Sequence, residues 1–111
     1  MDFEITAGGL KSPEGPIAMP DGSVILVEIK RGTLTRCWKG QSEVIAKIGG
    51  GPNGAAFGPD GAVYLCNNGG FAWHEANGMT IPGNAAEDYE TGRIERIDLN
   101  TGKVERIYEK I

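Results

Sequence analysis

The sequence contains few of the residues that build disulfide frameworks, zinc sites or histidine-dependent hydrolases. It has two cysteines, Cys37 and Cys66, and a single histidine, His74. The cysteines lack the short spacing of a zinc site, and we interpret both as buried free thiols. A Ser-His-Asp hydrolase is disfavoured as well, because no Gly-x-Ser-x-Gly segment supplies a nucleophile for the one histidine.

Long apolar runs and an excess of basic charge are also missing. No hydrophobic stretch approaches the roughly 20 residues of a membrane span, and the N-terminus does not read as a secretory signal. The net charge is −4, with acidic and basic residues interspersed, which gives no basic surface for nucleic acid. We therefore expect a cytoplasmic protein that binds neither nucleic acid nor membranes. A small neutral or anionic ligand stays open if a cation mediates its binding.

Glycine, by contrast, is abundant. The 111 residues include 18 glycines and 6 prolines, without the Gly-X-Y period of collagen. Glycine supplies the positive φ that tight turns require. The composition therefore favours a β-protein with many turns.

A repeat is the most informative feature of the chain. Residues 13–28 match residues 52–67 position by position, at a constant offset of 39 residues. Each copy predicts an apolar strand, a Pro-Asp-Gly turn and a second apolar strand. Two further strands follow each copy, at 33–38 and 43–48 in the first and at 93–98 and 103–108 in the second.

Four strands in about 40 residues are typical of a β-propeller blade. We therefore predict an all-β fold of two four-stranded antiparallel blades, with blade one at residues 12–48 and blade two at residues 51–111. A single eight-stranded sandwich or barrel uses the same strands and stays open as an alternative. Two blades leave two broad apolar faces uncovered, so we expect the remaining blades of the same protein, or copies of this chain, to cover them.

The second blade contains an insertion, residues 67–92, where the first has a four-residue connection. A connection this long is uncommon unless it is functional or disordered. Following the strand directions, we expect it to overhang the end of the blades at which Glu14 and Asn53 start the innermost strands, here called the mouth. Within it, Asn68 and His74 are candidate substrate contacts, and a surface loop held by Trp73 is the alternative interpretation.

Glu14 is the candidate metal ligand. A carboxylate at the start of an innermost strand points into a narrow channel and needs a partner there. A divalent cation with oxygen ligands is a natural one, and Asn53, the equivalent residue of the second repeat, adds an amide. The alternative is a solvated glutamate at a turn.

Four segments together resemble a known family, and the similarity covers nearly the whole chain. They are Ser-Pro-Glu-Gly-Pro at 12–16, Gly-Pro-Asn-Gly-Ala-Ala-Phe-Gly-Pro-Asp-Gly at 51–61, Cys-Asn-Asn-Gly-Gly-Phe at 66–71 and Gly-Arg-Ile-Glu-Arg-Ile-Asp at 92–98. The sequence is similar to the N-terminal part of the SMP-30/gluconolactonase/luciferin-regenerating-enzyme-like proteins. This resemblance implies a six-bladed β-propeller, of which residues 1–111 form an N-terminal portion.

The resemblance also implies an activity, the hydrolysis of sugar lactones at one divalent metal ion in the central channel. Ca²⁺ or Zn²⁺ is the expected ion, with Mg²⁺ and Mn²⁺ as further candidates. Glu14 matches the first metal ligand of the family, and Asn53 matches an asparagine that contacts substrate or metal-bound water. The later asparagine ligand and the catalytic aspartate are expected beyond residue 111, so the isolated chain is expected to be inactive. A non-catalytic propeller that binds partners is the alternative function, and strictosidine-synthase-like and NHL-type propellers are neighbouring families.

Overall fold

The computed structural model describes residues 7–109, and this part of the chain is all-β. Its strands are β1 (Pro13–Ala18), β2 (Val24–Glu28), β3 (Thr33–Trp38), β4 (Gln41–Lys47), β5 (Pro52–Phe57), β6 (Val63–Asn67), β7 (Phe71–Ala76), β8 (Met79–Ala85), β9 (Arg93–Ile97) and β10 (Val104–Tyr108). Within residues 7–109 there is no helix long and apolar enough to cross a membrane. The prediction of an all-β chain is confirmed.

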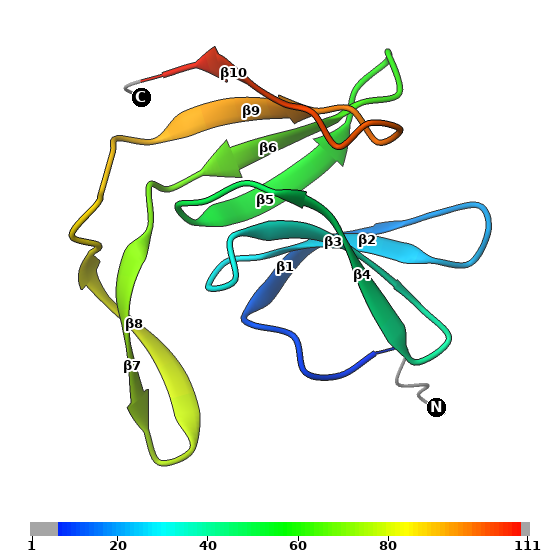
Figure 1. The fold of residues 1–111 in the computed structure, drawn as a ribbon. Helices are drawn as coiled ribbons and strands as arrows, with labels where there is room; N and C mark the ends of the chain where they lie inside the picture. The colour runs from blue at the N-terminus through cyan, green and yellow to red at the C-terminus, as the bar shows by residue number, and fades with distance from the viewer. Residues whose placement is uncertain (1–6, 110–111) are drawn as a thin grey trace.

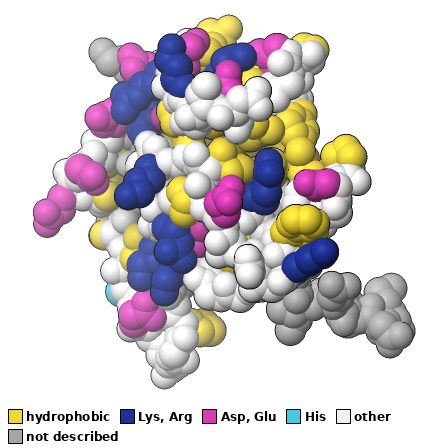
Figure 2. Space-filling model, turned by 45° about the vertical axis from the view of Figure 1, so that its right-hand side comes forward, with side chains coloured by type: hydrophobic (Ala, Val, Ile, Leu, Met, Phe, Trp, Pro, Cys, Tyr) yellow, Lys and Arg dark blue, Asp and Glu magenta, His cyan; other side chains and the backbone are white. Residues whose placement is uncertain are grey.

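Eight of these strands form two antiparallel sheets of four (Figure 1). Sheet one has the order β1-β2-β3-β4, and sheet two has the order β5-β6-β9-β10. The repeat predicts both sheets, and the observed strands begin and end within two residues of the predicted ones. Figure 2 shows basic and acidic side chains interspersed over one face of the molecule, as the sequence indicates.

The same turn closes the first hairpin of each sheet. Asp21 and Asp60 each accept a hydrogen bond from the backbone N–H two residues later, over 2.9 and 3.1 Å. Gly22 and Gly61 then take φ of 88° and 80°, a conformation that a residue with a Cβ adopts only at a cost. The Pro-Asp-Gly motif therefore marks the same end of both sheets.

The insertion contains a third, two-stranded sheet, formed by β7 and β8. Its strands meet at Asn77-Gly78, where both residues have positive φ, 52° and 74°, and where Ala76 pairs with Met79. Asn-Gly between two strands is a strong hairpin signal, so the sequence did carry the evidence for this element. The insertion is thus a hairpin between β6 and β9 rather than an irregular loop.

The two large sheets pack face to face, and each uses the face that is not equivalent to the one its neighbour uses. Sheet one contributes Ile25, Val27 and Leu34 to the buried core, and sheet two contributes Val63, Leu65 and Ile97. When the inserted hairpin is left out of the count, the three core residues of sheet one correspond in the second repeat to Tyr64, Cys66 and Ile94. These lie on the face of sheet two that points away from sheet one. Equivalent faces of the two sheets therefore point in the same direction, as they do in stacked repeats.

The outer faces of the pair differ, although the sequence predicts that both are uncovered. On the outer face of sheet one, Leu26, Thr35 and Cys37 are buried. On the outer face of sheet two, Cys66 is exposed and the side chain of Tyr108 is 64% exposed. Val44, which pairs with Thr35 on the outer face of sheet one, is nevertheless 44% exposed. Cys37 is buried as interpreted, whereas the interpretation of Cys66 as a buried thiol is wrong.

Candidate functional site

The inserted hairpin lies at the end of the sheets opposite the Pro-Asp-Gly turns (Figure 1). An ion pair of 3.3 Å joins Glu75 on β7 to Lys30, which follows β2 at this end. Phe71 and Trp73 stabilise the hairpin by an edge-to-face contact, with ring centroids 5.9 Å apart. The insertion thus lies at the mouth end, as the strand directions predict.

Glu14 and Asn53 lie at the starts of β1 and β5, and both are exposed. The two sheets approach each other most closely along these strands. Gly15 has a φ of 56°, and a Cβ built on it would lie only 2.9 Å from the backbone nitrogen of Ala55. A side chain at Gly15 would therefore separate the strands that carry Glu14 and Asn53.

Asn67, at the end of β6, holds the segment that leads into β5. Its Oδ1 accepts hydrogen bonds from the N–H groups of Gly51 and Gly69, both over 2.9 Å. Its Nδ2 donates to the carbonyl of Gly49 over 2.9 Å and to the carboxylate of Glu95 over 2.8 Å. All four hydrogen-bonding positions of this buried amide are satisfied, so Asn67 fixes the backbone just before Asn53.

Glu28, the equivalent residue at the end of β2, does the same for the segment that leads into β1. Its carboxylate accepts from the backbone N–H of Lys11 over 2.8 Å and from the side chain of Arg31 over 2.8 Å. The hydroxyls of Thr33 and Thr35 donate to it over 3.0 and 2.6 Å. A buried carboxylate is stable here because it is hydrogen-bonded on all sides.

Burial and these hydrogen bonds act in opposite directions on the pKa of Glu28. Burial alone would raise it, but the hydrogen bonds from Thr35, Arg31, Lys11 and Thr33 outweigh burial and lower the pKa below the ordinary 4.5. Glu28 is therefore ionised at neutral pH. We call Glu28 and Asn67, with the side chains that bond to them, the two latches of the mouth.

The backbone repeats the same geometry at both latches. The N–H of Ile29 donates to the carbonyl of Ser12 over 2.9 Å, and 39 residues later the N–H of Asn68 donates to the carbonyl of Gly51 over 2.9 Å. The sequence shows the repeat but not these contacts, because neither latch residue has a motif of its own. Each latch precedes one candidate site residue.

The other two candidate contacts, Asn68 and His74, lie in the insertion. The Oδ1 of Asn68 accepts from the N–H of Gly70 over 2.8 Å and so fixes a turn, whereas its buried Nδ2 has no hydrogen-bond partner in the described part of the chain. His74 is exposed on β7 and pairs with Ile81 on β8. Asn68 thus stands beside the Asn67 latch, and His74 lies further out on the hairpin.

The described residues do not bring together a complete metal site. Among residues 7–109 there is no group of three or more His, Cys, Asp or Glu side chains placed to hold one ion. Glu14 nevertheless suits such an ion, because its carboxylate forms no ion pair in this part of the chain and contacts only the N–H of Gly15, over 3.3 Å. Glu14 and Asn53 therefore offer two oxygen donors of the kind that hard cations prefer.

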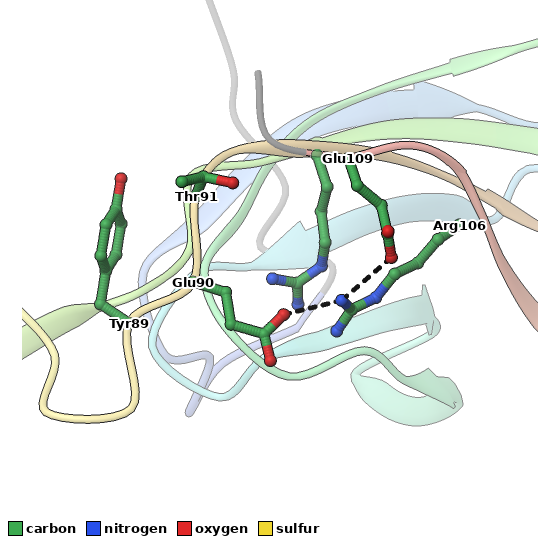
Figure 3. A pocket seen from close by; sticks show the side chains of 6 residues that line it. Tyr89, Glu90, Thr91, Arg106 and Glu109 are labelled. Carbon is green, nitrogen blue, oxygen red and sulfur yellow. Dashed lines mark hydrogen bonds and ion pairs between the residues drawn. The ribbon is translucent and has the colours of Figure 1, made fainter.

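The structure also contains a pocket that none of the four candidate residues lines. It has a volume of about 440 Å³ and lies between the connection that precedes β9 and the end of β10. Its lining residues are Tyr89, Glu90, Thr91, Arg93, Arg106 and Glu109 (Figure 3). Sequence reasoning missed it, because its parts are far apart in the chain.

No model of a protein family matches the chain, and no curated protein matches it. The similarity to the gluconolactonase-like proteins therefore remains a prediction from the sequence.

Proposed function

We propose that the two sheets are adjacent blades of a β-propeller, six-bladed when complete, and that the chain is part of a metal-dependent hydrolase of sugar lactones. The packing of the two sheets supports the first part. Sheet one packs on sheet two through one of its faces, and the repeat-equivalent face of sheet two is open. A third sheet can therefore pack on sheet two in the same way. Further blades of the same protein are the partners that this arrangement favours, and self-association is the alternative.

The observation that carries the second part is the position of Glu14 and Asn53. These repeat-equivalent residues are exposed at the starts of neighbouring strands, at the end of the sheets where the inserted hairpin lies. Buried latches hold the backbone just before both strand starts, so the two side chains are carried by rigid elements. In a closed ring both residues would face the central channel.

In this proposal Glu14 binds the cation and supplies the negative charge that offsets it, and further ligands come from other blades. Ca²⁺ or Zn²⁺ is the expected ion. The bound cation would polarise the lactone carbonyl as a Lewis acid. The amide of Asn53 would orient the lactone or the attacking water, and Asn68 and His74 would contact the sugar from the insertion.

Titration of the complete ring with Ca²⁺ and with Zn²⁺ by calorimetry tests the proposal. Glu14→Gln keeps the size of the side chain but removes its charge, so we expect metal affinity to fall about tenfold or more. Glu43→Gln is the matched control, because Glu43 is an exposed carboxylate on β4, away from the mouth. Equal metal affinity of Glu14→Gln and Glu43→Gln would leave Glu14 as a solvated residue at a turn.

A non-catalytic propeller that binds partners is the second candidate. A propeller can keep its scaffold without the chemistry, and the residues exposed at the mouth would then serve for binding alone. The same titration separates the two functions. A complete ring that binds neither ion and does not hydrolyse an aldonolactone would favour the binding module.

A further inference from the structure

The pocket beside β10 combines hydrogen-bond donors and acceptors at close range. Two guanidinium groups, Arg93 and Arg106, and two carboxylates, Glu90 and Glu109, line it together with the hydroxyl of Thr91 (Figure 3). The four charges balance within the lining. A free anion and a free cation would each meet as much repulsion as attraction there.

Arg93 is the residue that most needs a partner in this pocket. Its side chain is only 5% exposed, and in the part of the chain that the structure describes it donates no hydrogen bond. Its Nε lies 3.3 Å from a carboxylate oxygen of Glu95, close enough for an ion pair but not in hydrogen-bonding geometry. Arg93 thus lines the pocket with a guanidinium whose charge Glu95 balances and whose donors no described residue accepts in hydrogen-bonding geometry.

The remaining lining groups have spare hydrogen-bonding capacity. Nη1 of Arg106 donates to Oε2 of Glu90 over 2.7 Å and lies 3.3 Å from Oε1 of Glu109. The other donors of this guanidinium and the second oxygen of each carboxylate have no partner among the described residues. The hydrogen bond with Arg106 lowers the pKa of Glu90 below its ordinary value of 4.5, so the pair is charged at neutral pH.

We propose that this pocket binds a neutral polyhydroxylated ligand, such as a sugar ring. A hydroxyl group donates and accepts at once, so it can bridge a guanidinium and a carboxylate without adding charge. The ring of Tyr89, in a side chain that is 47% exposed, offers an apolar surface to the C–H groups of the ligand. The volume of about 440 Å³ lies in the range of small-molecule pockets.

This inference does not depend on the metal at the mouth, because none of the residues that line the pocket is a predicted metal ligand. Ligand-observed saturation-transfer NMR tests it, since the method works whether the chain is monomeric or associated. The probes are methyl α-D-glucopyranoside and myo-inositol, with gluconate as the charged comparison and inorganic phosphate as a competitor. Circular dichroism of each sample first establishes that the strands are formed.

We expect saturation transfer to both neutral polyols, with phosphate not displacing them. Arg106→Gln and Tyr89→Ala should each weaken the binding about tenfold, by removing a charged donor or the ring surface. The control is Arg96→Gln, an arginine on β9 that pairs with Asp60 at the far end of the sheet, and it should bind as the unmodified chain does.

Three results would overturn the proposal. The first is a folded chain that gives no transfer to either polyol. The second is binding that survives both Arg106→Gln and Tyr89→Ala. The third is displacement of both polyols by phosphate, which would make the pocket an anion site instead.

Discussion

Asn67 on β6 donates a hydrogen bond of 2.8 Å to Glu95 on β9, and both side chains are buried. In the first repeat the equivalent strands carry the opposite arrangement, with the carboxylate of Glu28 on β2 and the hydroxyl of Thr35 on β3. A single buried carboxylate thus occurs in each sheet, but on different strands. Both arrangements hold the backbone that leads into the innermost strand.

The Asn67 latch predicts a large loss of stability when it is removed. In Asn67→Ala, two buried backbone N–H groups and the carboxylate of Glu95 lose a hydrogen-bond partner, so we expect a cost of about 2–4 kcal/mol. Asn53→Ala is the matched control, because Asn53 is exposed and its loss should cost less than about 0.5 kcal/mol. Urea denaturation of both variants at one protein concentration measures the difference, and equal costs would show that the latch does not hold the strand.

The Glu28 latch predicts a pH dependence of stability. The pKa of Glu28 is lower in the folded chain than its ordinary 4.5, so the folded state gains stability above pH 4.5 and loses this gain as the pH falls. Glu28→Gln should cost about 1–3 kcal/mol at neutral pH, and the cost should shrink on acidification. Thermal midpoints measured from neutral to acidic pH test this, with Glu43→Gln as control. A cost that stays the same at every pH would refute it.

The open face of sheet two predicts self-association of the chain. Tyr108, 64% exposed, and Cys66 lie on this face beside apolar neighbours, and exposed apolar sheet faces promote contact between molecules. We expect sedimentation to show concentration-dependent association, which Tyr108→Lys reduces. Met79→Lys, at a 60% exposed position on the hairpin, should leave it unchanged. A monomer at all concentrations with a sharp thermal transition would contradict the assignment of sheet two as an internal blade.

The sequence predicts the two large sheets well, because both copies of the 39-residue repeat contain the Pro-Asp-Gly turn and the apolar strands on either side of it. Asp21 and Asp60 recur with their glycines, and the turns that they form are the same. The direction of the strands follows from these turns. The mouth end, with Glu14, Asn53 and the insertion, could therefore be located without coordinates.

The sequence does not predict the contacts between the segments. Glu28 and Asn67 read as the last residues of apolar strands, and only the fold shows that the backbone before Glu14 or Asn53 comes within their reach. The pocket beside β10 is invisible for the same reason, since Glu90 and Arg106 meet only across the sheet edge. The inserted hairpin is a different case, because Asn77-Gly78 is a local hairpin signal in the sequence itself.

The most direct test of the proposed function is the rate of aldonolactone hydrolysis by the complete ring, with and without a divalent metal, for the unmodified protein, Glu14→Gln and Asn53→Ala. We expect metal-dependent hydrolysis by the unmodified protein. Glu14→Gln should lower both the rate and the metal affinity, whereas Asn53→Ala should lower the rate and largely keep the metal, because an amide positions the substrate without neutralising the charge of the ion. A Glu14→Gln variant that hydrolyses the lactone at the unmodified rate, with the same dependence on metal, would contradict the assignment of Glu14 as a metal ligand.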